Sequence, residues 1–339
     1  MKLSEIGAEG LISRIVQKRH LPSSAPGLVA GIGGDAAVIS PESAGMLTLV
    51  TTDMLTERTD YLPHQITPYQ LGWKSAAANI SDIAAMGGLP TWTFASIGFR
   101  PETDVEYIDE LYRGIVECGN CFGSILAGGD TNSVLGDAVI SITQLGRVEQ
   151  NNLARRSGAR PGDRILVTGC LGDSLGGLYL LLRLGLAEAL SASKNLIEAH
   201  FLPMPRIPEA RAAVGTGFIR AMMDLSDGLA ADLPKLCRAS GVGAVVYAER
   251  LPISNHLCTG AERLGISAAE LAEGGGEDYE LLMAVAPEGV PSVTQAIEET
   301  GTRVTDIGEI LPGGIAIELA GGERRPLKGG WEHFAGEQS

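Results

Sequence analysis

The clearest pattern in the chain is a run of small apolar residues at helical spacing between Pro68 and Gly87. Most of them are alanine or isoleucine, which gives the narrow surface that a tightly packed helix needs. Thr67 is suited to cap the start of this helix, and Pro68 fits its first turn, where the missing N–H costs nothing. Gly87 and Gly88 permit the left-handed conformation that ends a helix. Asp82 lies in this apolar context, where a buried charge needs a partner.

Short or alternating apolar runs elsewhere are typical of strands. In the first half we predict helices at 5–19 and after a capping box at 103–106, and strands at 35–39, 46–52, 91–98, 124–127 and 139–146. In the second half we predict strands at 164–168, 243–248, 280–286 and 303–309, and helices at 175–189, 208–215 and 227–240. Because a turn at Arg160–Asp163 precedes a fresh strand, we expect domains at 1–150 and 151–339. Both mix helices with strands, which predicts the α/β (α+β) class.

Composition narrows the classes of protein to consider. With 45% apolar and 20% charged residues, the chain of 339 residues is expected to fold, and it is long enough for two cores. Its net charge of −15 argues against binding to nucleic acid or to anionic membranes. Arg183 and Glu188 interrupt the longest apolar run, so we expect no membrane span.

The five cysteines are scattered, and Cys118 and Cys121 form a lone C-x-x-C without a second pair at zinc spacing. We interpret them as structural or incidental thiols, with a redox or metal role as the alternative. No apolar signal region follows Met1, so a reducing, cytoplasmic location is expected.

Acidic residues recur where predicted strands or helices end beside small residues. The six motifs are Gly34-Asp35, Thr52-Asp53, Ser81-Asp82, Gly129-Asp130, Asp224-Leu225-Ser226-Asp227 and Gly276-Glu277-Asp278. An Asp beside glycine is usually a turn residue, and Asp82 taken alone could be satisfied by a backbone amide or a lysine. Six such motifs are better explained by one shared site, because functional residues gather on loops that a rigid scaffold holds.

Carboxylates gathered in one site repel one another unless cations intervene. Their hard oxygen ligands favour Mg²⁺, which commonly bridges to substrate phosphates. The five histidines are isolated, and we interpret each as a surface or hydrogen-bonded residue. The sequence contains neither a G-x-x-x-x-G-K-[ST] phosphate loop nor the protein-kinase motifs. A nucleotide enzyme of this kind relies on metal ions and glycine amides for phosphoryl transfer.

Seven segments, in this order along the chain, resemble the thiamine-monophosphate kinase family. They are residues 31–37 (GIGGDAA), 51–55 (TTDML), 79–87 (NISDIAAMG), 128–131 (GGDT), 224–229 (DLSDGL), 275–281 (GGEDYEL) and 330–334 (GWEHF). This family belongs to the aminoimidazole-ribonucleotide-synthetase-like ATP-binding superfamily. The resemblance implies a two-domain synthetase-like fold. It also implies a homodimer whose N-terminal α/β domains pair into a shared barrel, with ATP bound near that interface.

The resemblance further implies an activity, the Mg²⁺-dependent transfer of the ATP γ-phosphate to thiamine monophosphate, which gives thiamine diphosphate. The positions that match metal ligands of the family are Asp35, Thr51, Thr52, Asp53, Asp82, Asp130, Asp224 and Asp227. The positions that match nucleotide contacts are Gly129, Asp130, Arg156 and Ser226, although a surface ion pair is the alternative for Arg156.

Glu277 and Trp331 match the substrate end of the site. An aromatic face at this point can stack on the cationic thiazolium ring, because aromatic rings attract cations. The alternative for Trp331 is a packing anchor for the tail. Since the acceptor is itself a phosphate whose second pKa is about 6, we expect no general base.

The sequence departs from the family pattern at two places. Gly34 stands where the family usually has a first Asp, and we align Asp35 with the second, metal-binding Asp. The family usually carries a His in the segment that reads Glu57-Arg58-Thr59-Asp60 here. We therefore include Asp60 among the substrate residues, where its carboxylate would repel the substrate phosphate unless it is protonated or bridged by a metal.

Two alternatives to a thiamine-phosphate kinase follow from these departures and from the superfamily. The first is another synthetase of the superfamily. A selenophosphate synthetase is expected to carry an early reactive cysteine, whereas Cys118 is the first here, and a hydrogenase-maturation relative is expected to end in cysteine, not in Ser339. The second alternative is a nucleotide-binding regulator that has lost catalysis.

Overall fold

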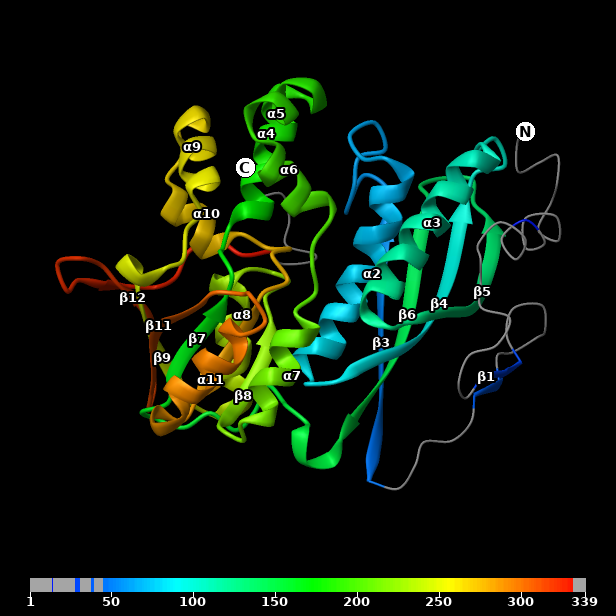
Figure 1. Ribbon diagram of the computed structural model, residues 1–339. Helices are drawn as coiled ribbons and strands as arrows, with labels where there is room; N and C mark the ends of the chain where they lie inside the picture. Colours follow the sequence, from blue (N-terminus) through cyan, green and yellow to red (C-terminus); the bar gives the residue numbers. More distant parts are fainter. Residues whose placement is uncertain (1–13, 15–27, 31–37, 40–44, 332–339) are drawn as a thin grey trace. The chain divides into compact units, whose positions relative to one another are not determined.

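The computed structural model describes residue 14, residues 28–30 and 38–39, and residues 45–331 (Figure 1). The rest of the helix expected at 5–19, the glycine-rich lead-in and Asp35 lie outside the described residues. The chain divides into two compact units, of which the first contains the described residues up to Ile83 and Gly88–Gln150, and the second contains Ala84–Gly87 and the residues from Asn151 onward.

The first unit is built on a four-stranded sheet in the order β3-β6-β4-β5. Its elements are β3 (Met46–Thr56), α2 (Pro68–Ala85), β4 (Leu89–Phe99), α3 (Val105–Phe122), β5 (Ile125–Ser133) and β6 (Val139–Glu149), with a separate pair formed by β1 (Leu28–Ala30) and β2 (Val38–Ile39). β3 pairs antiparallel with β6 from Met46↔Glu149 to Thr56↔Val139, and β4 pairs parallel with β5. α2 and α3 cover one face of the sheet (Figure 1).

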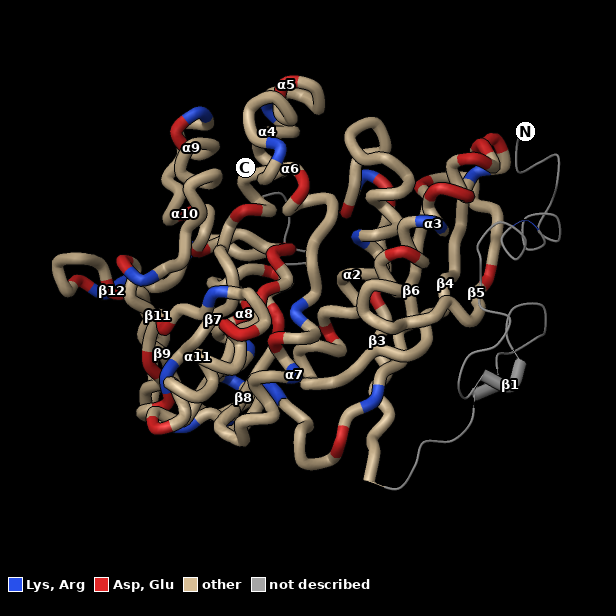
Figure 2. Tube along the Cα trace, viewed as in Figure 1, with Lys and Arg blue, Asp and Glu red and all other residues tan. Residues whose placement is uncertain are grey.

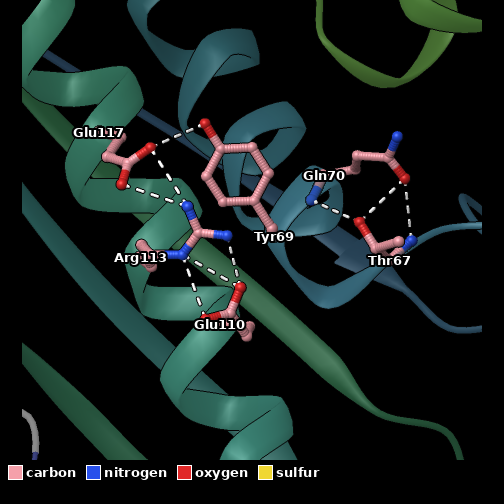
Figure 3. Close-up of polar contacts among 6 residues, drawn as sticks. All are labelled: Thr67, Tyr69, Gln70, Glu110, Arg113 and Glu117. Atoms are coloured by element: carbon pink, nitrogen blue, oxygen red, sulfur yellow. Dashed lines mark hydrogen bonds and ion pairs between the residues drawn. The ribbon is translucent and has the colours of Figure 1, made fainter.

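Two glycines set the distance between α2 and α3. A Cβ atom on Gly72 would lie 1.9 Å from the carbonyl oxygen of Leu111, and one on Gly114 would lie 2.0 Å from that of Tyr69. No side chain fits at either point, so glycine allows the two backbones to approach closely. Beside this contact the guanidinium of Arg113 lies 4.1 Å from the centre of the Tyr69 ring, and the Tyr69 hydroxyl donates to Glu117 over 2.9 Å (Figure 3).

The ends of α2 confirm the prediction for this helix. The Gln70 N–H donates to Thr67 Oγ1 over 3.2 Å, while the Thr67 N–H donates to Gln70 Oε1 over 3.0 Å, which is a reciprocal capping box (Figure 3). At the other end Gly87 has φ +72°, and the Gly88 N–H donates to the Ile83 carbonyl over 2.9 Å. The capping box predicted at 103–106 is wrong, because α3 begins with Asp104 as its N-cap and this side chain makes no capping hydrogen bond.

The second unit is built on a seven-stranded sheet in the order β13-β12-β9-β11-β7-β10-β8. The strands are β7 (Arg164–Thr168), β8 (Ile219–Asp224), β9 (Gly243–Tyr247), β10 (Leu281–Val285), β11 (Val304–Leu311), β12 (Ile315–Glu318) and β13 (Arg324–Arg325). All neighbours are antiparallel except β12 and β9. The core lies between this sheet and its helices, and it includes the buried residues Val167, Met223, Leu233 and Leu282.

The helices of the second unit are shorter than those of the first. They are α4 (Asp173–Leu184), α5 (Leu186–Ala192), α6 (Lys194–Phe201), α7 (Ile207–Gly215), α8 (Leu229–Ser240), α9 (Asn255–Leu264), α10 (Ala268–Gly274) and α11 (Val290–Glu298), with single 3₁₀ turns at Gln150–Asn152, Ala248–Arg250 and Pro287–Gly289. The single helix predicted at 175–189 is wrong, because Gly185 adopts φ +75° and separates α4 from α5. Within the described part of the chain, none of the helices has both the length and the apolar character that crossing a membrane requires.

Candidate functional site

In the first unit, β3 and α2 bring three of the predicted metal ligands together. Thr51 Oγ1 donates a hydrogen bond to Asp82 Oδ2 over 2.5 Å, and the Asp53 N–H donates to Asn79 Oδ1 over 3.0 Å. Thr51 and Asp53 share one face of a strand, while Asn79 and Asp82 share one face of a helix. The carboxylates of Asp53 and Asp82 therefore come from facing surfaces of β3 and α2.

Thr52 and Asp130 lie at other places on the same sheet. Thr52 Oγ1 donates to the Ile142 carbonyl of β6 over 3.0 Å. Asp130 is exposed on β5, in register with Ser96, and three strand spacings separate β5 from β3, on the order of 14 Å. The first unit therefore gathers Thr51, Asp53 and Asp82 but leaves Asp130 on the far edge strand.

Neither Asp53 nor Asp130 stands at the end of a strand, contrary to the sequence prediction. β3 continues past Asp53 to Thr56, since it pairs with β6 along its whole length, and β5 continues past Asp130 to Ser133 beside β4. Gly129 makes the passage of β5 possible, because a Cβ atom there would lie 1.8 Å from the Ala95 carbonyl oxygen.

The donors of the first unit fit a hard divalent cation. Thr51, Asp53 and Asp82 offer only oxygen, and Mg²⁺ is commonly held by one or two carboxylates, with water and substrate phosphate completing its shell. Among the described residues, no group of three or more His, Cys, Asp or Glu side chains is placed to hold a metal ion. Asp35, which the sequence predicts as a further ligand, lies outside the described part of the chain.

In the second unit, the loop after β8 carries the predicted residues Asp224, Ser226 and Asp227. Asp224 is the last residue of β8 and is only 2% exposed. Lys235 of α8 donates to Asp227 Oδ2 and, over 2.8 Å, to Asp232 Oδ1. Burial opposes the charge on Lys235, but these hydrogen bonds raise its pKa, so the lysine stays charged. A metal ion at Asp227 would therefore compete with an internal cation.

Backbone hydrogen bonds join this loop to the glycine-rich loop, residues 274–280, and to Trp331. The Glu277 N–H donates to the Ser226 carbonyl over 2.8 Å, and the Trp331 N–H donates to the Asp227 carbonyl over 2.9 Å. The Trp331 side chain is 54% exposed. The second unit thus places Ser226, Asp227, Glu277 and Trp331 next to one another, although they come from three distant parts of the sequence.

The acidic residues of the glycine-rich loop have different hydrogen-bond partners. Asp278 accepts hydrogen bonds from the N–H groups of Gly172, over 2.6 Å, and Ser174, over 3.1 Å, at the start of α4. Burial raises the pKa of Asp278 well above its usual range, and these two hydrogen bonds oppose that rise. Glu280 accepts from Thr168 Oγ1 over 2.6 Å and forms a two-pronged ion pair with Arg206, with distances of 2.6 and 2.7 Å.

Glu277 differs from both of these neighbours. It adopts φ +62°, which is uncommon for a residue other than glycine, and its side chain is 30% exposed. Its Oε2 lies 3.5 Å from Nδ1 of the buried His200, which also lies 3.0 Å from Ser174 Oγ. Glu277 is thus the acidic side chain of this loop with the greatest access to a ligand.

Asp60 and Arg156 each make a hydrogen bond within their own unit. Asp60 Oδ2 accepts a hydrogen bond from the Thr56 N–H over 2.7 Å, at the turn after β3, so the carboxylate closes a turn. Arg156 is exposed on the loop before β7, where its carbonyl oxygen accepts from Ser240 Oγ over 3.3 Å. Acidic residues are spread over both units rather than collected in one (Figure 2).

Comparison with known proteins shows the family to which the chain belongs. The profile of the AIR synthase related protein, N-terminal domain, matches residues 33–148, and that of the C-terminal domain matches residues 160–319. The thiamine-monophosphate kinase of Aquifex aeolicus is 34% identical over 335 residues, which cover 98% of this chain and 100% of that protein. The chain belongs to the thiamine-monophosphate kinase family. It is therefore an enzyme of the kinase class, and the resemblance seen in the sequence is confirmed.

Solved structures agree with membership of the thiamine-monophosphate kinase family. The enzyme from Stenotrophomonas maltophilia has a TM-score of 0.79 at 32% identity, covering 93% of this chain and 95% of that one. The structure of AaThiL complexed with AMPPCP and TMP has a TM-score of 0.75 at 31% identity, covering 98% and 99%. The hydrogenase maturation protein HypE of E. coli, at 20% identity and a TM-score of 0.73, shares the fold alone. The mixed α/β fold of two units predicted from the sequence is confirmed.

Several polar residues of the two groups were not assigned a role by sequence reasoning. Asn79 fixes the backbone at Asp53, Lys235 pairs with Asp227, and Ser174 and His200 adjoin Glu277. Asn79 could have been found, because it lies one helical turn before Asp82. The other three lie far from their partners in the sequence or in an ordinary helix, so no spacing pattern indicates them.

Proposed function

We propose that the chain transfers the γ-phosphoryl group of ATP directly to the phosphate of thiamine monophosphate, forming thiamine diphosphate and ADP, with Mg²⁺ as the metal. The observation that carries this proposal is the similarity, along 98% of the chain, to AaThiL complexed with AMPPCP and TMP. The residues of the matching motifs have the side-chain chemistry that this reaction needs.

In the first unit Thr51, Thr52, Asp53, Asp82 and Asp130 would hold Mg²⁺, and in the second unit Asp224 and Asp227 would do so. When bound, the metal supplies neutralisation of the phosphate charges, which is the main requirement of phosphoryl transfer. Asp35 is proposed as a ligand from the sequence alone.

The protein's own residues orient the two substrates. Gly129 is exposed on β5 and is proposed to contact the triphosphate, and Arg156 and Ser226 supply a cation and a hydroxyl for it. The acceptor phosphate is largely ionised at neutral pH, with a second pKa of about 6, so no residue has to remove a proton. The chain's contribution is therefore alignment and electrostatic stabilisation of two anions that repel each other.

Glu277 and Trp331 are proposed to bind the cationic end of thiamine monophosphate. Glu277 supplies a carboxylate of partial exposure, and the exposed indole of Trp331 supplies a π face, which attracts cations. Asp60 is proposed to border the substrate phosphate. Asp60→Asn keeps an oxygen that can accept the Thr56 N–H but removes the negative charge that would repel the phosphate. The KM for thiamine monophosphate should therefore fall modestly, whereas an unchanged KM would place Asp60 outside the site.

The decisive experiment measures thiamine diphosphate formed by the purified protein from ATP and thiamine monophosphate, with thiamine as the control acceptor. Product formed from thiamine monophosphate, and lost on chelation of Mg²⁺, supports the proposal. Calorimetry distinguishes the alternative, because a regulator would bind ATP but form no thiamine diphosphate. Activity on thiamine but not on its monophosphate would refute the assigned substrate.

Exposed apolar side chains on β3 support a homodimer. Val50 and Met54 are 66% and 60% exposed, and two large apolar side chains on one face of a strand are suited to an interface with a second copy. The combined Val50→Glu and Met54→Glu variant should shift the species seen by light scattering from dimer to monomer. Leu182→Glu, at a position that is 55% exposed on α4, is the matched control and should leave the mass unchanged.

A further inference from the structure

His200 is a buried histidine that the phosphoryl-transfer chemistry does not use. It lies near the end of α6 and is 6% exposed, and Ser174 of α4 is 1% exposed. Nδ1 of His200 lies 3.0 Å from Ser174 Oγ and 3.5 Å from Glu277 Oε2. A buried imidazole that meets both a hydroxyl and a carboxylate through one nitrogen needs an explanation beyond packing.

Asp278, Ser174, His200 and Glu277 contact one another in series, and the first and last of them are neighbours in the same loop. Asp278 accepts the Ser174 N–H over 3.1 Å and so holds Ser174 at the start of α4. Ser174 Oγ meets His200, His200 meets Glu277, and Glu277 is the residue before Asp278. Asp278 restrains Ser174, Ser174 restrains the imidazole of His200, and the imidazole restrains the Glu277 carboxylate.

The backbone of the loop that carries Glu277 has hydrogen bonds that do not involve His200 or Ser174. The Glu277 N–H donates to the Ser226 carbonyl over 2.8 Å, and the Tyr279 N–H donates to the Leu225 carbonyl over 3.0 Å. The positive φ values of Glu277 and Tyr279, +62° and +52°, direct the two side chains. The loop backbone therefore has supports of its own when His200 is changed, while the imidazole lies against the side chain of Glu277.

We propose that His200 is a positioning residue for Glu277, and that Ser174 holds the imidazole in the orientation that this role requires. With a proton on Nδ1, the ring donates to Ser174 Oγ over 3.0 Å, and the same N–H lies 3.5 Å from Glu277 Oε2, close enough to attract the carboxylate. The carboxylate is then ordered before the cationic substrate arrives, which lowers the cost of binding it. This inference rests on the proposed function, because it takes thiamine monophosphate as the ligand of Glu277.

The test compares two substitutions of nearly equal shape. His200→Leu removes the donor, whereas His200→Asn keeps an N–H close to the place of Nδ1. His200→Leu should raise the KM for thiamine monophosphate about tenfold, because it removes a donor that lies beside a charged group, and leave the KM for ATP within about twofold. His200→Asn should recover most of this loss, and Ser174→Ala should raise the same KM about threefold.

A double-mutant cycle shows whether His200 acts through Glu277. In a Glu277→Gln background, His200→Leu should add little to the KM for thiamine monophosphate. Full additivity of the two effects would overturn the proposal, and so would an unchanged KM in His200→Leu. If His200→Leu does not fold, Ser174→Ala carries the same cycle, since it should raise the same KM by itself.

The control for a general loss of stability is Asp163→Ala in the same unit. Asp163 closes the turn before β7 by accepting the Arg160 N–H over 2.7 Å, at the end of β7 away from Thr168 and Glu280. This variant should melt at a lower temperature with an unchanged KM, and an equal rise in KM would overturn the inference. A wild-type protein that forms no thiamine diphosphate refutes the proposed function itself, whereas an active wild type with an unaltered His200→Leu refutes only the role of His200.

Discussion

The two units each contain a segment of glycines followed by an acid, at Gly128–Asp130 on β5 and at Gly274–Asp278 between α10 and β10. On β5, glycine serves the close approach of a neighbouring strand, and Asp130 stays exposed. In the second segment the acids are divided, because Asp278 is buried under the start of α4 while Glu277 keeps access to a ligand. Similar residues are thus exposed in one place and cap a helix in another, and burial distinguishes them.

The largest expected effect concerns the acids assigned to phosphate chemistry. Asp130→Asn and Asp82→Asn should each lower kcat by about 10²–10³-fold, because each removes a carboxylate proposed to hold the Mg²⁺ that neutralises the transferring phosphoryl group. The melting temperature of Asp130→Asn should stay close to that of the wild type, since the side chain is exposed. Steady-state assays at saturating Mg²⁺ measure this, and unchanged turnover in both variants would remove the metal assignments.

The acid of the second segment should behave in the opposite way. Asp278→Ala leaves two N–H groups at the start of α4 without an acceptor and should lower the free energy of unfolding by about 3 kcal/mol. Urea denaturation measures the loss. A stable Asp278→Ala protein would show that this carboxylate does not support α4, and the contrast between the two segments would then fail.

The glycine of the first segment offers a smaller effect on stability. Gly129→Ala places a methyl group 1.8 Å from the Ala95 carbonyl oxygen, so β5 has to move away from β4, which should cost about 2 kcal/mol. Gly136→Ala, whose Cβ would have no atom within 4 Å, is the control and should be close to neutral. Equal melting temperatures for the two variants would contradict the close approach at Gly129.

The smallest effect comes from an acid outside both segments and depends on pH. Arg100 donates to Glu57 over 2.8 Å and lowers the pKa of Glu57 below 4.5, against the effect of burial. A lowered pKa in the folded state stabilises the protein above the unfolded pKa, and this contribution is lost as the pH falls through the folded pKa. Glu57→Gln should therefore cost about 1 kcal/mol at pH 7 and progressively less below pH 4.5.

Glu110→Gln is the matched control for Glu57→Gln. Glu110 also pairs with an arginine, Arg113, but the two side chains are 45% and 42% exposed, so solvent screens the pair. Denaturation at several pH values should show a smaller loss for this variant. A loss at pH 7 as large as that of Glu57→Gln would mean that burial does not distinguish the two pairs.

Much of the fold could be predicted from local pattern, because apolar periodicity depends on nearby residues. The strand predicted at 91–98 is Leu89–Phe99, and the helix predicted at 208–215 is Ile207–Gly215. Predictions of strand ends fail where a neighbouring strand determines how far the pairing continues. β3 and β5 run on past Asp53 and Asp130 because neighbouring strands continue the pairing, which no local signal shows. α9 and α10 were missed because polar residues dilute their apolar positions.

The candidate site divides in the same way. Asp53 and Asp82 belong to the acidic motifs, whereas Thr51 is predicted through the family resemblance. The structure places the three on facing surfaces of β3 and α2. The pairing of Asp227 with Lys235 could not be read from the sequence, since a lysine eight positions away on a helix has many other uses. His200 was interpreted as a surface or hydrogen-bonded residue, and the structure shows the second of these.

The position of β7 in its sheet has a consequence for the protein during synthesis. β7 is the first strand of the second unit to leave the ribosome, yet its two neighbours, β10 and β11, are the fourth and fifth. The nascent chain therefore carries Ile165 and Val167, both buried in the finished protein, without a sheet to receive them until residues 281–311 have been translated. Translation arrest before Leu281 should leave a chain that aggregates or recruits a chaperone, whereas an arrest after Leu311 should not.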